Sequence, residues 1–106
     1  MEEFIQIEWV AATLEEAREI MELLLAKGLI SSGSIYPSVE SWFVLEGEVV
    51  TEQEVKVVMK TLGHHYKKIE LEIKKHHSYE IPEILFFTVE NGNDQYLKWM
   101  VDQVMR

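Results

Sequence analysis

The sequence contains no cysteine, only two prolines and no long apolar run. Without cysteine, the chain cannot form disulfides, thiolate metal sites or a thiol-based catalytic centre. No apolar stretch approaches the ~18 residues of a membrane-spanning helix. The acidic start, Met1-Glu2-Glu3-Phe4, lacks the basic and apolar regions of a signal peptide. We therefore expect a cytoplasmic protein.

Basic residues are also scarce: ten Lys and Arg stand against nineteen Asp and Glu, and the formal net charge is −9. Such an average field repels the phosphate backbone, so we expect no nucleic-acid partner. It attracts cations weakly and also keeps a protein soluble. The sequence contains no Gly-X-Ser-X-Gly elbow, P-loop or dinucleotide-binding fingerprint. These absences favour a binding protein over an enzyme.

What is present is a chain that can form a folded core. At 106 residues with 47% hydrophobic content, residues 1–106 are expected to form one globular domain. Ile5, Ile7 and Trp9 alternate with polar residues, which is typical of a half-buried strand. Thr13 begins a capping box that opens a helix with apolar residues at helical spacing, and Gly28 is placed to end it.

Two long strand-like segments follow and are joined by a turn at residues 46–48. The first spans residues 29–45 and contains Pro37, which predicts an edge position or a bulge. The second spans residues 49–60, with Val55, Val57 and Met59 on one face. This hairpin is longer than a small sheet needs. We therefore predict that its far end pairs with something outside the domain.

The remaining elements complete a recognisable order. Tyr66, Ile69 and Ile73 define one face of a second helix, with Thr61 as its expected cap and Leu71 off the apolar face. Residues 84–89 are continuously apolar, which predicts a central strand. Residues 93–104 predict a final helix capped by its first residue, an asparagine. The order is βαββαβ plus a C-terminal helix, which predicts an α+β, ferredoxin-like sandwich with an antiparallel sheet.

Polar chemistry is concentrated at the boundary formed by residues 76–84. His77 could bind a metal ion through one ring nitrogen, with Glu80 or Glu83 as a second ligand. Alternatively, it is a C-terminal helix residue that interacts with backbone carbonyl groups. The pair His64 and His65, near the start of the second helix, is expected to be exposed.

Several motifs, taken together, resemble the CutA family of divalent-cation tolerance proteins. The run Pro-Ser-Val-Glu-Ser at residues 37–41 and the later pairs at 46–47, 54–55 and 60–61 resemble the middle of that family. Residues 77–84 resemble its His-Pro-Tyr-Glu-X-Pro-Glu-Ile motif, and residues 92–99 resemble its closing Gly-Asn-X-X-Tyr-Leu-X-Trp motif. The resemblance spans nearly the whole chain in the same order.

The resemblance implies a ferredoxin-like protomer and a homotrimer in which the long hairpins complete sheets with neighbouring subunits. It also implies a role in tolerance of, or response to, divalent cations such as copper. By the same resemblance, Lys60, Tyr79, Glu83 and Trp99 line a cleft between subunits. Two alternatives remain: a metal-independent PII-like trimer that binds a small ligand or a protein in this cleft, or a purely structural contact made by salt bridges and aromatic packing.

The chain departs from the family pattern at a proposed metal ligand. Ser32 stands where the family commonly has cysteine. A hydroxyl group is a much poorer ligand than a thiolate for Cu(I), so the departure argues against high-affinity copper binding.

Overall fold

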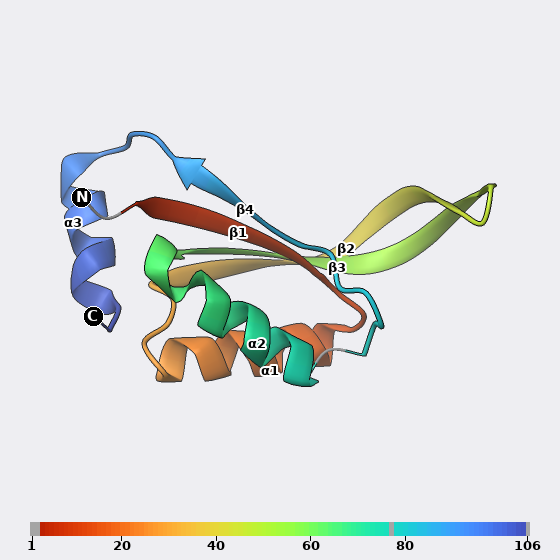
Figure 1. Cartoon of the computed structure of the whole chain (residues 1–106), viewed down its shortest axis with the longest axis horizontal. Helices are drawn as coiled ribbons and strands as arrows, with labels where there is room; N and C mark the ends of the chain where they lie inside the picture. Colours follow the sequence, from red (N-terminus) through yellow and green to blue (C-terminus); the bar gives the residue numbers. More distant parts are fainter. Residues whose placement is uncertain (1–2, 77, 106) are drawn as a thin grey trace.

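The protein is a two-layer sandwich of one antiparallel sheet and two helices (Figure 1). The computed structural model describes residues 3–76 and 78–105. The sheet order is β2-β3-β1-β4, and α1 and α2 cover one face. This arrangement confirms the predicted ferredoxin-like fold. The elements are β1 (Phe4–Ala11), α1 (Leu14–Ala26), β2 (Ser32–Leu45), β3 (Glu48–Leu62), α2 (Tyr66–His76), β4 (Ile84–Val89) and α3 (Asp94–Gln103).

The core lies between the sheet and these two helices. The alternating residues Ile5, Ile7 and Trp9 of β1 are fully buried, as their period of two predicts. They pack in one cluster with the apolar stripe of α1, which includes Ile20 and Leu24. Fully burying side chains of this kind contributes about 1.5–3 kcal/mol each. The cluster therefore fixes the helices against the sheet.

The ends of α1 form as the sequence predicts. The Thr13 hydroxyl accepts a hydrogen bond from the backbone N–H of Glu16 at 3.1 Å and satisfies one of the unpaired donors of the first turn. After the helix, Gly28 has a φ of 70°. This left-handed conformation is readily adopted by glycine and ends the helix.

The hairpin of β2 and β3 extends beyond the rest of the sheet (Figure 1). Glu46 and Gly47 form the turn with φ values of 50° and 81°. The strand register shifts between Tyr36 and Val39, so the bulge predicted at Pro37 is confirmed. β1 pairs with β3 only as far as Val55. Residues 39–45 and 48–54 therefore form a two-stranded ribbon, called here the distal ribbon.

The prediction that residues 84–89 form a central strand was wrong. The strand exists as β4, but it lies at the sheet edge and pairs only with β1. Leu85, Phe86 and Phe87 are 46–54% exposed. Continuous apolarity indicates that a strand needs cover on both faces, and the described protomer does not supply that cover.

Two smaller predictions at the start of α2 were also wrong. Thr61 does not cap the helix, because β3 continues to Leu62 and a 3-10 turn (Gly63–His65) precedes α2. The buried Thr61 hydroxyl instead donates to the Leu29 carbonyl at 2.6 Å. His64 is exposed as expected, but His65 is only 3% exposed. The His65 ring hydrogen-bonds to the backbone carbonyl of Met105, in the C-terminal segment after α3, and this bond compensates for the burial of the ring.

The final helix, α3, is capped by Asn93, as predicted. The Asn93 side chain accepts a hydrogen bond from the backbone N–H of Tyr96 at 3.0 Å. Met100 and Val104 are buried and hold this C-terminal region against the protomer. In the part of the chain that the structure describes, no helix is both long enough and apolar enough to cross a membrane.

Candidate functional site

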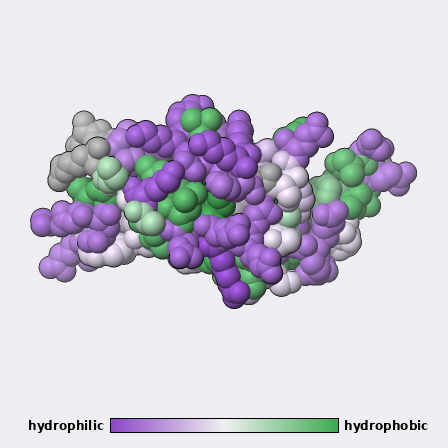
Figure 2. Space-filling model, turned by 90° about the horizontal axis from the view of Figure 1, so that it is seen from below, coloured by the Kyte–Doolittle hydropathy of each residue, from purple (hydrophilic) through white to green (hydrophobic). Residues whose placement is uncertain are grey.

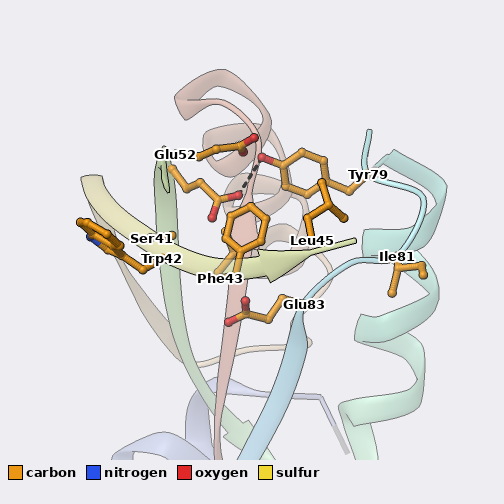
Figure 3. A pocket seen from close by; sticks show the side chains of 10 residues that line it. Ser41, Trp42, Phe43, Leu45, Glu52, Tyr79, Ile81 and Glu83 are labelled. Carbon is orange, nitrogen blue, oxygen red and sulfur yellow. Dashed lines mark hydrogen bonds between the residues drawn. The ribbon is translucent and has the colours of Figure 1, made fainter. Parts of the chain in front are cut away.

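A cavity of about 640 Å³ lies between the distal ribbon and the segment that connects α2 to β4 (Figure 3). Its size falls in the range of small-molecule sites, roughly 300–1,000 Å³. The walls come from the end of β1, both strands of the ribbon and the connecting segment. The lining residues are Val10, Ser41, Trp42, Phe43, Leu45, Glu52, Glu54, Tyr79, Ile81 and Glu83.

The connecting segment is held to the sheet and helix layers at three points. The Tyr79 hydroxyl donates to the Glu54 carboxylate of β3 at 2.9 Å. Ser78 donates through its backbone N–H (2.7 Å) and its hydroxyl (3.1 Å) to the Glu16 carboxylate of α1. The backbone N–H of Val10 donates to the Glu83 carbonyl at 3.2 Å. These bonds fix the wall that carries Tyr79.

Tyr79 is the side chain with the clearest electrostatic signature in the cavity. Its pKa is raised to about 12, first by burial and then by the hydrogen bond to Glu54, because a phenolate would face the carboxylate. The nearby charges of Glu52 and Glu16 act in the same direction. Tyr79 therefore stays a neutral hydrogen-bond donor at physiological pH.

The cavity combines carboxylates with apolar and aromatic surface. Glu52, Glu54 and Glu83 contribute three carboxylates, and none of the lining residues is basic. Figure 3 shows Phe43 near Tyr79, with Glu83 below Phe43. Carboxylates accept hydrogen bonds, and aromatic faces attract cations. The chemistry of the walls therefore suits a cationic group better than an anionic one.

The structure brings together two of the four residues expected to line the cleft. Tyr79 and Glu83 both line the cavity. Lys60 lies elsewhere on β3, opposite Gln6 of β1. Trp99 is on α3, where its ring stacks on Tyr96 at 5.6 Å between centroids. Within one protomer these two do not reach the cavity, and their role in a cleft between subunits stays a prediction.

Among the described residues, the structure does not bring the expected metal ligands together in the cavity. Glu80 is exposed and does not line the cavity. His77 lies outside the described residues. Within residues 3–76 and 78–105, no three His, Asp or Glu side chains form a group that could hold a metal ion. This holds for the three carboxylates of the cavity as well, and Cu(I) prefers sulfur ligands to oxygen donors.

Sequence reasoning missed the contribution of the distal ribbon to the cavity. Glu52 and Glu54 alternate with other residues along β3, so both lie on the same face of the strand. Phe43 and Leu45 show the same spacing on β2. The sequence signal for this wall was the period of two in the part of the hairpin that extends beyond the sheet. The sequence pattern does not show where the connecting segment lies, and only the tertiary structure supplies that position.

Comparisons with known proteins match nearly the whole chain. The model of the family described as "CutA1 divalent ion tolerance protein" matches residues 6–103. The divalent-cation tolerance protein CutA of Thermus thermophilus is 34% identical over 100 residues, covering 94% of this chain and 95% of the relative. The corresponding protein of Archaeoglobus fulgidus is 34% identical over 104 residues, covering 98% and 99%.

Solved structures support the same assignment. The Thermus thermophilus Cut A1 structure has a TM-score of 0.88 and 32% identity, covering 99% of this chain and 100% of that one. The Archaeoglobus fulgidus structure, described as a periplasmic divalent cation tolerance protein, has a TM-score of 0.87 and 32% identity, with the same coverage. From the family match, the sequence identity and the shared fold, we conclude that this chain belongs to the CutA1 divalent ion tolerance protein family.

Proposed function

We propose that this chain is a cytoplasmic, homotrimeric binding protein that acts without catalysis in the tolerance of divalent cations such as copper. The observation that carries the proposal is the family match over residues 6–103. The net charge of −9 supports it, because an acidic protein attracts cations. Fractionation of cells that produce the protein tests the location. Recovery with periplasmic or secreted proteins would contradict it.

Exposed apolar surface supports the trimer. Trp42, Val44 and Val49 on the distal ribbon are 66–70% exposed. On β4, Phe86 and Phe87 are nearly half exposed. Large apolar areas of this kind mark interaction surfaces. Both elements also have a free strand edge in the described protomer, and such edges pair readily with other chains.

Strand pairing between copies would cover the apolar surfaces of the distal ribbon and of β4 in one contact. If the distal ribbon of one protomer pairs along β4 of the next, the contact is head-to-tail, and the proposed trimer is the case in which three such contacts close a ring. The ring would cover the apolar residues of the ribbon and of β4. It would also bring new side chains to the cavity beside Tyr79, where Lys60 and Trp99 of a neighbour are the expected contributors.

Metal binding is tested by equilibrium titration with Cu(II), Zn(II) and Ni(II). We expect saturable binding by the wild-type protein and weaker binding after His77→Ala, because His77 is the candidate imidazole ligand. His64→Ala serves as the matched control, since His64 is an exposed histidine on the 3-10 turn before α2. Absence of saturable binding would contradict the metal-binding part of the proposal.

The second candidate function is metal-independent binding of a small ligand in the cavity. The observation that favours it is a 640 Å³ space with the neutral donor Tyr79 and three carboxylates. Soaking crystals with a panel of small amines tests this function. Density beside Tyr79 that persists in the presence of a chelator would support it, and density restricted to other surfaces would contradict it.

A further inference from the structure

A second groove, of about 550 Å³, lies on the helical face of the protomer, away from the cavity beside Tyr79. It is formed by the end of α1, the middle of α2 and the C-terminal segment. Figure 2 shows this face, where apolar surface is exposed among hydrophilic side chains. The lining residues are Ala26, Lys27, Leu29, Lys68, Leu71, Glu72, Lys75 and Met105.

The apolar wall of the groove includes Leu71. The buried stripe of α2 is formed by Ile69 and Ile73, and Leu71 lies off that stripe with 59% exposure. Met105 lies at the groove, and its backbone N–H donates to the Gly28 carbonyl at 2.8 Å. A hydrogen bond between its carbonyl and the His65 ring further holds this segment. The apolar surface is therefore already in place without a ligand.

The rim of the groove is basic, although the chain as a whole is acidic. Lys27, Lys68 and Lys75 face a single lining carboxylate, Glu72, which leaves two net positive charges. Glu72 already binds Lys27 Nζ at 2.8 Å and lies 3.9 Å from Lys75 Nζ. Among the described residues, Lys68 has no ion-pair partner. A bound anion would therefore balance the excess positive charge of the lysines that line this groove.

Further lysines extend the positive surface along α2. Lys67 and Lys74 are exposed on the same helix, and their common carboxylate neighbour is Glu70, at 3.7 and 3.9 Å. Half of the ten basic residues of the chain thus lie on α2 or at the end of α1. Such clustering attracts anions locally even when the average field is negative.

We propose that this groove binds a small organic anion with an apolar body, of the class of medium-chain carboxylates. The carboxylate would bind Lys68 and Lys75, and the aliphatic chain would cover Leu71, Leu29 and Met105. The volume is in the usual range for small ligands, about 300–1,000 Å³. The site is separate from the proposed cation-related function and does not depend on it.

The test uses the full-length protein and octanoate, with octanol and octylamine as neutral and cationic probes of the same chain length. Binding is followed by amide chemical shifts in two-dimensional NMR spectra. We expect octanoate to shift amides in segments 26–29 and 68–75 and to bind about two- to thirtyfold more tightly than octanol, since two exposed charge pairs contribute roughly 0.2–1 kcal/mol each. Octylamine should bind more weakly than octanol.

Single substitutions separate the charged and apolar contributions. Lys68→Gln should weaken octanoate binding about 1.4- to fivefold, the effect of one exposed ion pair, and leave octanol binding unchanged. Leu71→Ser should weaken both. Lys98→Gln is the control, because Lys98 is an exposed lysine on α3 beside Asp102. Equal binding of octanoate and octylamine, shifts confined to residues outside the groove, or equal effects of Lys68→Gln and Lys98→Gln would overturn the proposal.

Discussion

The distal ribbon offers the sharpest test of assembly, through a pair of valines directly opposite each other. Val44 of β2 and Val49 of β3 are cross-strand partners and are 69% and 70% exposed. Full burial of a valine side chain contributes about 1.5–3 kcal/mol. Since about two thirds of each side chain remains to be covered, burial between subunits contributes roughly 1–2 kcal/mol per valine.

The double variant Val44→Ser, Val49→Ser should therefore weaken association by roughly 2–4 kcal/mol per protomer. At about 1.4 kcal/mol for each factor of ten, this corresponds to a loss of roughly 30- to 700-fold in the association constant for each subunit that joins. The fold of the protomer should survive, because both side chains point to solvent in it. The assay is sedimentation equilibrium over a dilution series, with circular dichroism to confirm folding.

Leu25→Ser is the matched control. Leu25 is 45% exposed on α1, away from the distal ribbon and from β4. It should leave the association constant unchanged. The reasoning is refuted if the double variant dissociates at the same concentration as the wild type, or if Leu25→Ser weakens association as much.

Three further predictions concern the protomer itself. Tyr66 and Tyr79 should titrate with pKa values of about 12, above the ordinary value of a phenol, and absorbance at 295 nm measures this titration. Because both pKa values are raised in the folded protein, the neutral phenols stabilise the fold fully below pH 10. This contribution to the free energy of unfolding should fall between pH 10 and 12. Titration of all tyrosines near pH 10 in the folded protein would contradict this. Tyr79→Phe should lower the free energy of unfolding by about 1 kcal/mol, since it removes the donor to Glu54, and urea denaturation that shows no change would argue against this tether. Thr13→Ala should cost about 1 kcal/mol through loss of the cap to the Glu16 N–H, whereas Thr13→Ser should retain most of the stability.

The elements that could be predicted from the sequence are those whose signals are local. The period of two in β1, the cap at Thr13 and the glycine stop at Gly28 each depend on neighbouring residues only. The bulge at Pro37 is similar, because a missing N–H group limits where proline can sit in a ladder. These local rules were sufficient for the order of elements and hence for the fold.

The errors arose where contacts distant in the sequence decide the outcome. The apolar run of β4 predicted a strand covered on both faces, but in the described protomer β4 lies at the sheet edge with half-exposed side chains. His65 is buried because the C-terminal segment, 40 residues later, supplies an acceptor. Thr61 has a partner 32 residues earlier in the chain. No local pattern contains such long-range partners.

The candidate site shows the same division. Tyr79 and Glu83 were identified by their resemblance to a family motif, and both line the cavity. Glu54, the hydrogen-bond partner of Tyr79, was not identified as a site residue. Its place in the cavity depends on how the connecting segment folds onto the ribbon, which the sequence pattern does not show. Lys60 and Trp99 lie away from the cavity in one protomer, so their predicted role depends on assembly.

The mass of the wild-type protein in solution tests the central claim most directly. Multi-angle light scattering at micromolar concentration should give three times the 12.5 kDa mass of the protomer. The physical reason is that the distal ribbon and β4 have exposed apolar side chains and strand edges in the described protomer, which a ring of three copies would cover. A stable monomer or dimer at that concentration would contradict the account.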